Sequence, residues 1–555
     1  FLASTGAVID FVGGSHTLGN MTSSGAGTWQ LSGAAVSVSA GNTVNASNVA
    51  FNAGSVSGPG ELLITGNAST WTGGTLAGNL RVASGGTLTL SGGVKNFASG
   101  AALTNQGNVV WSSGTLQPAG PGTSTITNAS GALFDIQGDL AVTDTVNNDT
   151  NTHTLNFVNQ AGGELRRSSG TGTATLGGQF DGNDVMLFNL QNNGNVNVMT
   201  GTVQINQFGT SSANGGSFQI ASGALFDVVA GTHTFGNMTS SGAGSWRLSG
   251  GTVGVSAGAS ANLSNLAFNG GTLAGPGEVL ITGNGSSWNG GVLSGNLRVA
   301  SGGLLTLAGG MKLVASGAQL TNQGNVVWTA GNIEPANSGS STITNASGAV
   351  FDIRGDVAVT DTVNNDTNTH TLSFVNQSGG ELRRSTSAGT VTLGGFFDGN
   401  DVMLFNLQND GTFNVATGTV VQALGGFVSG TNNGTVLIGT DAILSTNGAA
   451  LTNSATGVIR GTGTLDLGTA TLTNDGTIAP GTSIGTLSIT GNLAQGSSGA
   501  IDVELAGSSA GLYDVLAVSG SAALNGTLNV GYLGGYTPAV GAVHPVLTYA
   551  SQTGT

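Results

Sequence analysis

The heptapeptide LTNQGNV stands at residues 103–109 and again, letter for letter, at 320–326. Three variants keep the order apolar, Asn, Gly, apolar: LQNNGNV at 190–196, LQNDGTF at 407–413 and LTNDGTI at 472–478. The alternating apolar residues predict short strands with one face turned inward. Asn and Gly accept a left-handed backbone conformation, so we expect them to turn a corner. The motif therefore predicts a strand, a corner and a second strand.

The motif belongs to a longer duplication. Met21 recurs as Met238, 217 residues later (238 − 21 = 217), and the other matching residues have the same offset. No insertion or deletion separates the two copies. We therefore predict two copies of one β-solenoid unit, at residues 1–217 and 218–434.

A shorter period lies inside each copy. The sequences WTGGTL (71–76) and WSSGTL (111–116) are 40 residues apart, and half of that distance, about 20 residues, is typical of one solenoid coil. Segments such as LRVASGGTLTL (80–90) alternate polar and apolar residues around Gly-Gly, and no long stretch has helical spacing. The predicted fold is all-β: a right-handed parallel β-solenoid of roughly 20–21-residue coils with a distinct C-terminal β cap.

The 217-residue register stops after residue 434. Coil-like sequence continues beyond it, so we predict terminal solenoid coils over 435–500. All four tyrosines lie after residue 512, and the open end of a sheet invites aggregation. Residues 501–555 are therefore predicted to form a C-terminal β cap or assembly segment, made of antiparallel strands with aromatic side chains in wider spaces.

Composition excludes several classes of partner and chemistry. Charged residues make up only 7% of the chain, where about a quarter is usual. The net charge of −15 and the scarcity of clustered Lys and Arg exclude nucleic acid as a partner. No cysteine is present, which rules out disulfides and thiol chemistry. No apolar run approaches the roughly 18–20 residues of a membrane span, and the chain opens at Phe1 without a signal-peptide pattern, as expected of a mature or excised segment.

Two groups of motifs resemble known families. The run APGTSIGTLSITGNL (479–493), followed by YDVLAVSGSAALNGTLNV (513–530), resembles the C-terminal passenger region of bacterial autotransporters and related secreted β-helix proteins. The Asn-x-Gly coils and FVNQAGGELRRSSGTGTATL (157–176) are similar to filamentous-haemagglutinin-like adhesins. The resemblance implies adhesion, surface coating or matrix building outside a bacterial cell.

Three functions are compatible with these patterns. The leading hypothesis is a non-enzymatic structural or adhesive protein, located outside the cell or on the bacterial surface, in a matrix or in a sheath filament. Such a protein is expected to form homo-oligomers or filaments and to contact surface glycans or other cells through many weak contacts. It needs no cofactor.

The second hypothesis is a glycan-binding array. Exposed, regularly spaced indoles stack on sugars, and the candidates are Trp71, Trp111, Trp288 and Trp328. The opposing interpretation is that the indoles fill wide points inside the coil, which the glycines beside them favour. The burial of these side chains separates the two interpretations.

The third hypothesis is a polysaccharide lyase or hydrolase. Such enzymes need two or more carboxylates on neighbouring coils, about 10 Å or less apart in a groove. Here the acids are thinly scattered, and both repeats carry the same polar residues. We therefore expect no enzyme and assign no catalytic residue.

Two polar stretches, each present twice, are candidates for metal sites. TDTVNNDTNTHT, at 143–154 and 360–371, lacks the ligand spacing of calcium loops and of zinc sites, so we expect a polar loop between coils. FDGNDVMLFN, at 180–189 and 397–406, is compatible with a structural calcium ion or with a tight turn. Its candidate ligands are Asp181, Asn183, Asp184, Asp398, Asn400 and Asp401.

One charged cluster remains, formed by Glu164, Arg166 and Arg167. Neighbouring residues of a strand point to opposite faces, so only one of the two arginines can share the face of Glu164. We expect an exposed ion pair, which contributes little stability.

Overall fold

The computed structural model describes the chain except for the residues 145–151, 181–183, 214, 363–368, 398–400 and 555. The described residues form 66 β-strands and no helix, which confirms the predicted all-β class. They divide into two compact units, Phe1–Val279 and Leu280–Thr555.

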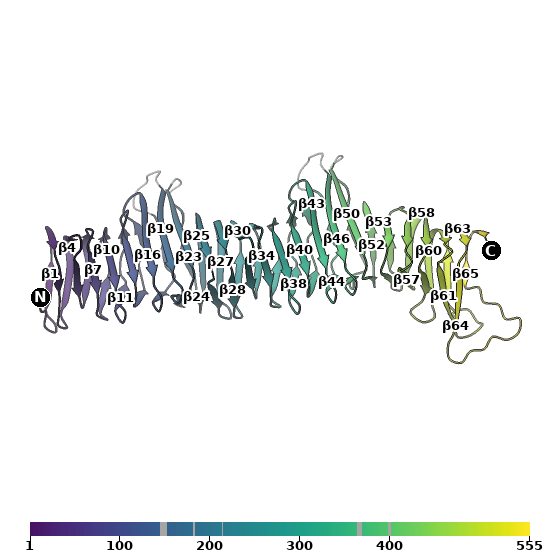
Figure 1. Cartoon of the computed structure of the whole chain (residues 1–555), viewed down its shortest axis with the longest axis horizontal. Coiled ribbons are helices and arrows are strands. Elements are labelled where there is room, and N and C mark those ends of the chain that lie inside the picture. The colour runs from purple at the N-terminus through teal and green to yellow at the C-terminus, as the bar shows by residue number, and fades with distance from the viewer. Residues whose placement is uncertain (145–151, 181–183, 214, 363–368, 398–400, 555) are drawn as a thin grey trace. The chain divides into compact units, whose positions relative to one another are not determined.

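The first unit is a stack of parallel coils with three strands in each coil. One coil comprises β11 (Thr87–Leu90), β12 (Lys95–Phe97) and β13 (Ala102–Asn105). The next coil comprises β14 (Asn108–Trp111), β15 (Leu116–Pro118) and β16 (Gly122–Asn128). β11 pairs with β14, β12 with β15 and β13 with β16, and all three pairings are parallel (Figure 1). Each coil therefore lies on its neighbour along three ladders.

The second unit is built in the same way. One of its coils comprises β54 (Thr435–Ile438), β55 (Ile443–Ser445) and β56 (Leu451–Asn453). The following coil comprises β57 (Val458–Gly461) and the long strand β58 (Thr464–Asn474), which covers two sides. The three pairings between these coils are parallel. The predicted parallel β-solenoid is thus confirmed for each unit.

Antiparallel strand pairs occur at matching places in the two sequence repeats. They are β22 (Gly178–Phe180) with β23 (Asp184–Asn192), and β49 (Gly395–Phe397) with β50 (Asp401–Asn409). Around them the coils widen and the strands lengthen, and each set of long strands rises from its unit as a lobe (Figure 1). The first lobe contains β16, β19 (Thr152–Asn159) and β23.

Alternation of side chains builds the core. In β11, Leu88 and Leu90 point inward and are buried, while Thr87 and Thr89 are partly exposed. All six tryptophans are at most 2% exposed. Trp71 stacks on Phe51 from the adjacent coil, with ring centroids 5.2 Å apart and an interplanar angle of 13°. Aromatic side chains thus fill the centre of the coil, where each buries a large apolar area.

The asparagines of the opening motif form a buried ladder along the coil stack. In the first unit each side-chain amide donates to the side-chain oxygen of the next, over Asn105, Asn128, Asn159 and Asn192. In the second unit the same ladder runs over Asn322, Asn345, Asn376, Asn409, Asn432, Asn453, Asn474 and Gln495. All of these asparagines are 0% exposed.

The ladder corrects the expected role of these asparagines. The described non-glycine residues with positive φ are Ser387, Ser429, Asp441 and Asn447, and none belongs to the motif. Asn105 instead keeps a strand conformation, because its amide donates at 2.8 Å both to Asn128 Oδ1 and to the carbonyl of Leu133.

The glycine of the motif serves close packing. A Cβ atom on Gly107 would lie 2.4 Å from the carbonyl oxygens of Ala83 and Gly86 on the preceding coil. Any side chain at this position would push the coils apart. The Asn-x-Gly pair thus combines an inward amide with a close approach between coils, and it turns no left-handed corner.

The strands within residues 501–554 continue the coil stack. The strands β64 (Thr527–Tyr532) and β66 (Ser551–Gly554) pair in parallel with β61 (Ala500–Leu505) and β63 (Ser521–Leu524). The expectation of an antiparallel cap is therefore wrong for these strands. The reason is the alternation of apolar residues, which places Leu528 in register with the buried Ile501.

Candidate functional site

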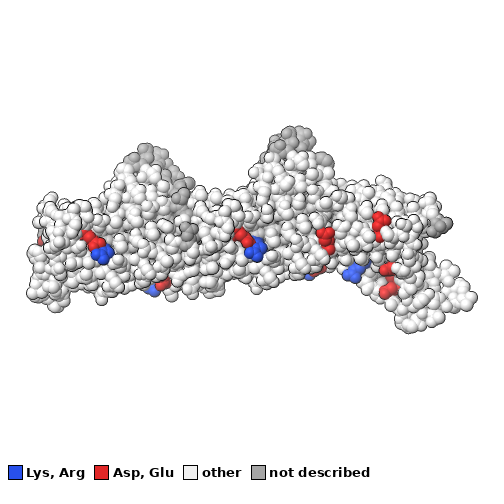
Figure 2. Space-filling model, in the orientation of Figure 1, with Lys and Arg blue, Asp and Glu red and all other residues white. Residues whose placement is uncertain are grey.

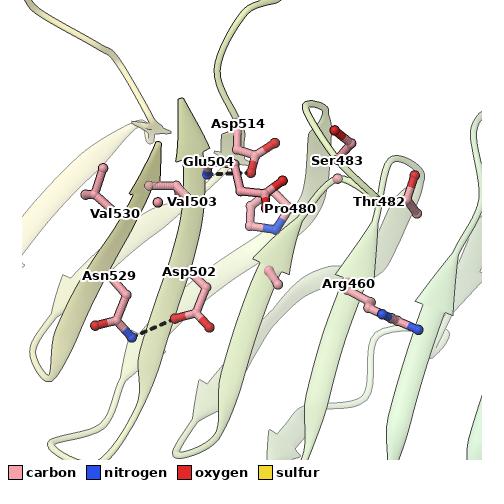
Figure 3. Close-up of a pocket in the computed structure, with 13 residues that line it drawn as sticks. Arg460, Pro480, Thr482, Ser483, Asp502, Val503, Glu504, Asp514, Asn529 and Val530 are labelled. Carbon is pink, nitrogen blue, oxygen red and sulfur yellow. Dashed lines mark hydrogen bonds between the residues drawn. The ribbon is translucent and has the colours of Figure 1, made fainter. Parts of the chain in front are cut away.

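A groove of about 510 Å³ crosses the outer face of the second unit (Figure 3). Its polar lining comes from β57, β59 (Thr477–Pro480), β61, β64, the turn after β59 and the residue before β62 (Val515–Val518). The lining side chains that bear on its chemistry are Arg460, Asp502, Glu504, Asp514 and Asn529.

The register of the coils explains the hollow. Arg460 pairs with Ala479 on the next coil, and Asp502 pairs with Asn529 one coil further on. The short side chain of Ala479 therefore lies in a row of longer ones. In Figure 3, Arg460 and Asn529 lie on opposite sides of Asp502. A basic residue and an acidic strand thus lie on either side of the groove.

Asp514 is the buried carboxylate of the groove, at 1% exposure. Its Oδ1 accepts the backbone N–H of Gly485 at 2.8 Å, and its Oδ2 accepts the backbone N–H of Glu504 at 2.7 Å. Burial raises the pKa of Asp514, the two hydrogen bonds oppose this rise, and the charge of Glu504 adds to it. Because both oxygens hold backbone groups, Asp514 joins the turn after β59 to β61.

Asp502 and Glu504 lie on the outer face of β61, two residues apart. Asn529 Nδ2 donates to Asp502 Oδ1 at 2.7 Å. The groove therefore gathers three carboxylates that the two sequence repeats do not share, although Asp502 and Glu504 lie on one strand and not on neighbouring coils. Glycosidic cleavage needs one carboxyl to donate a proton and a second to act as base or nucleophile. The two backbone hydrogen bonds of Asp514 leave Asp502 and Glu504 for such roles.

Sequence reasoning missed this groove. Its residues belong to four different coils, and only the register of those coils brings them together. An alignment of the terminal coils with one another would have placed these outward-facing polar residues in one row and so indicated the groove.

The tryptophans do not provide a surface for glycans. Trp71, Trp111, Trp288 and Trp328 are at most 2% exposed. Trp111 Nε1 donates to the carbonyl of Gly114 at 3.0 Å, inside its own coil. The array of exposed indoles is therefore contradicted, and the interpretation as core side chains is confirmed.

Part of the repeated stretch TDTVNNDTNTHT is buried. His153 Nε2 lies 2.7 Å from Asp144 Oδ2, and the equivalent atoms of His370 and Asp361 are 2.9 Å apart. All four side chains are at most 1% exposed. The polar loop that we expect between coils therefore begins and ends at a buried His–Asp pair. Residues 145–151 and 363–368, within the two copies, lie outside the described part of the chain.

The calcium prediction concerns residues that are largely outside the described part of the chain. Asp181, Asn183, Asp398 and Asn400 lie outside it. Asp184 and Asp401 begin β23 and β50, and only their backbone is described. Among the described residues, no group of three or more His, Asp or Glu could hold a metal ion.

The arginine pair is divided between surface and interior. Arg166 shares the outer face of its strand with Glu164 and pairs with Asp135 on the neighbouring coil, at 2.9 Å. Arg167 points inward, is buried, and contacts Asp139 at 2.6 Å. The predicted partner on the outer face is Glu164, whereas Arg166 pairs with Asp135. In the second repeat Arg383 contacts Asp352 at 3.0 Å and Glu381 at 3.5 Å. Sequence reasoning missed the buried Arg167.

Two buried lysines were also missed. Lys95 and Lys312 occupy the same place in the two repeats and are 0% exposed. Lys95 Nζ donates to the carbonyls of Gly93 and Ser113, at 2.8 and 2.6 Å. The sequence contained a signal for this burial, since Lys95 lies two residues before the inward Phe97 in one strand and therefore shares its face.

The described residues contain no helix that could span a membrane. The chain matches no protein-family model. It also matches none of the curated proteins, so the likeness to bacterial adhesins rests on sequence motifs alone.

Proposed function

We propose that this chain is a non-enzymatic structural and adhesive solenoid that works outside a bacterial cell, on its surface or in a matrix or sheath. The observation that carries the proposal is the coil stack itself, with its buried asparagine ladder. Between Asn432 and Gln495 each step of the ladder spans 21 residues, and every amide is buried. Such a body is suited to holding surfaces at fixed positions.

The energetics of the ladder support this role. Asn453 donates to Asn474 Oδ1 at 2.8 Å and to the carbonyls of Gly457 and Thr477, at 3.0 and 3.1 Å. A buried amide without partners would cost about 1–3 kcal/mol, so the ladder specifies one register for each coil. Stability in a solenoid is approximately a sum over neighbouring coils. Opening one coil would therefore break its contacts with the coils on both sides.

Adhesion is expected to be multivalent. The two repeats carry corresponding lobes, so one chain presents similar polar surfaces more than once. Weak contacts repeated on one chain give high avidity without a single strong pocket. The chain is also proposed to associate into homo-oligomers or filaments, which would multiply these contacts further.

Glycan cleavage is a second candidate, because one observation favours it. The groove of Asp502, Glu504 and Asp514 gathers acids, and the pKa of Asp514 is raised by burial. Against it stand the two backbone hydrogen bonds that hold Asp514. We give the structural role precedence for this reason.

Two measurements on the purified chain test the proposal together. Negative-stain imaging at several concentrations should show elongated particles or ordered fibres. Incubation with neutral and acidic polysaccharides should release no new reducing ends and no unsaturated products. Product release that disappears in a Glu504→Gln variant would replace the structural role with the enzymatic one.

A further inference from the structure

A second groove, of about 570 Å³, lies on the first lobe. It is formed within the first unit by β16, β19, β23, β25 (Thr202–Ala213) and β27 (Leu225–Phe235). Its polar lining consists of amides and hydroxyls, from Thr125, Asn156, Asn189, Gln191, Ser212 and Thr234.

The coil register builds this groove in two rows. Thr125, Asn156 and Asn189 are in register on successive coils. Two residues further along the strand, Gln191 is in register with Ser212. The second row continues from Ser212 to Thr234.

An irregular strand lies beside the two rows. β25 shifts register between Asn206 and Thr210 where it pairs with β27. It meets β23 in register at Gln191 and Ser212. The register of β25 is thus irregular beside the two rows.

The chemistry of the lining is uncharged. Asn189 Nδ2 donates to Asn156 Oδ1 at 2.9 Å, which fixes the orientation of both amides. Val158 and Leu190 add apolar surface to the lining. In the view of Figure 2, the described surface of the lobe carries no Lys, Arg, Asp or Glu. An acidic polysaccharide would find no basic partner here.

We infer that this groove binds a segment of a neutral polysaccharide. The volume lies within the roughly 300–1,000 Å³ of ligand sites, and amides with hydroxyls are suitable partners for sugar hydroxyls. The rows repeat at about 4.8 Å, the spacing of neighbouring strands, which is close to the length of one sugar residue in an extended chain. The inference rests on the proposed adhesive function and names the ligand class of one of its surfaces.

The second repeat supplies a natural comparison. Asn156 corresponds to Ser373 (373 − 156 = 217). The hydroxyl row is kept in the second repeat, where Thr431 and Thr452 are in register. The second repeat thus lacks one amide of the lining. We therefore expect one neutral-glycan site in each chain, on the first lobe.

Calorimetric titration of the full chain tests the inference. The probes are cellohexaose and maltohexaose, which are neutral, and hexagalacturonate, which is acidic. At least one neutral probe should bind with a stoichiometry of one, and the acidic probe should not bind. Asn156→Ala and Gln191→Ala should each weaken this binding about tenfold, because each removes an amide that hydrogen-bonds the ligand.

The matched control is Ser373→Ala, at the position equivalent to Asn156, which should leave binding unchanged. Asn156→Asp, which keeps the shape of the side chain, provides a second variant, and circular dichroism checks the fold of each. The inference is overturned if neither neutral probe binds, if the acidic probe binds as well, or if Ser373→Ala weakens binding as much as Asn156→Ala. Failure of the proposed function would appear separately, as compact particles in the images.

Discussion

The side-chain amide of Asn453 donates to Oδ1 of Asn474 at 2.8 Å, and both residues are completely buried. They stand 21 residues apart in the chain and in register on neighbouring strands. The same bond occurs on the adjoining coils. Asn432 donates to Asn453, and Asn474 donates to Gln495. One buried asparagine therefore links its coil to the coils before and after it.

Replacement of a ladder asparagine should destabilise the second unit. Asn453→Ala removes one of the two acceptors of the Asn432 amide and leaves Oδ1 of Asn474 without its donor from Asn453. We expect a loss of about 2–4 kcal/mol in the free energy of unfolding, because two buried polar groups lose a partner. The midpoint of chemical denaturation, followed by circular dichroism, measures the loss.

Asn433→Ala is the matched control for this change. Asn433 is the exposed neighbour of Asn432, and its side-chain amide donates only to Oδ1 of Asp410, at 3.1 Å and on the surface. The midpoint should move little. Equal effects of Asn433→Ala and Asn453→Ala would contradict the ladder.

Stability should rise with pH on the alkaline side of neutrality. Burial lowers the pKa of Lys95 and of Lys312 from 10.5 to about 8. Between these two pH values the unfolded chain binds more protons than the folded chain, so the free energy of unfolding increases with pH. Each lysine contributes up to about 3 kcal/mol to this increase.

Comparison with the double variant Lys95→Met, Lys312→Met isolates the contribution of the lysines. Groups that titrate in both proteins, such as tyrosines, cancel in the difference. The variant should lose the increase between pH 8 and pH 10.5. Parallel stability curves for the two proteins would show that the lysines are not buried as described.

The tryptophan fluorescence of the native chain should be that of buried indoles. Since all six side chains are at most 2% exposed, we expect blue-shifted emission and weak quenching by acrylamide. Trp71→Ala should lower the free energy of unfolding by about 3–5 kcal/mol, because Phe51 and Phe97 lose a large packed neighbour. Strong quenching in the native protein would restore the hypothesis of exposed indoles.

Asp514→Ala should loosen the turn beside the acidic groove. Hydrogen exchange at the backbone amides of Gly485 and Glu504 should accelerate, because both lose their carboxylate acceptor. Asp502→Ala is the control, since the side chain of Asp502 accepts from Asn529 and not from these amides. Unchanged exchange in Asp514→Ala would free this carboxylate for chemistry and would strengthen the enzyme hypothesis.

Much of the fold could be predicted because it depends on local pattern. Period-2 alternation and a repeat of about 20 residues leave few arrangements other than a stack of parallel coils. The role of Asn105 could not be predicted in the same way. Its preference for left-handed turns is a property of the isolated residue, whereas its inward amide acquires partners only from Asn128 and Leu133 on the next coil.

The two grooves show the same limit for functional sites. Asp502 and Asn529 are distant in sequence and adjacent in register, and Ala479 matters only because it is short. On the first lobe the groove lies beside a register shift after Asn206, which no sequence motif predicts. The residue type alone therefore suggested tryptophans as glycan-binding residues, although they are buried, and gave no reason to choose the amides that line a groove.

A double-cysteine variant tests the coil stack most directly, because the chain has no cysteine of its own. Thr452 and Thr473 are in register on neighbouring parallel strands, so their Cα atoms lie within the roughly 4.4–6.8 Å that a disulfide spans. Thr452→Cys with Thr473→Cys should cross-link readily on mild oxidation. Thr452→Cys with Thr464→Cys should not, although Thr464 is nearer in sequence, because it lies on a different side of the coil and pairs with Ile443. Cross-linking of the second pair in preference to the first would contradict the solenoid.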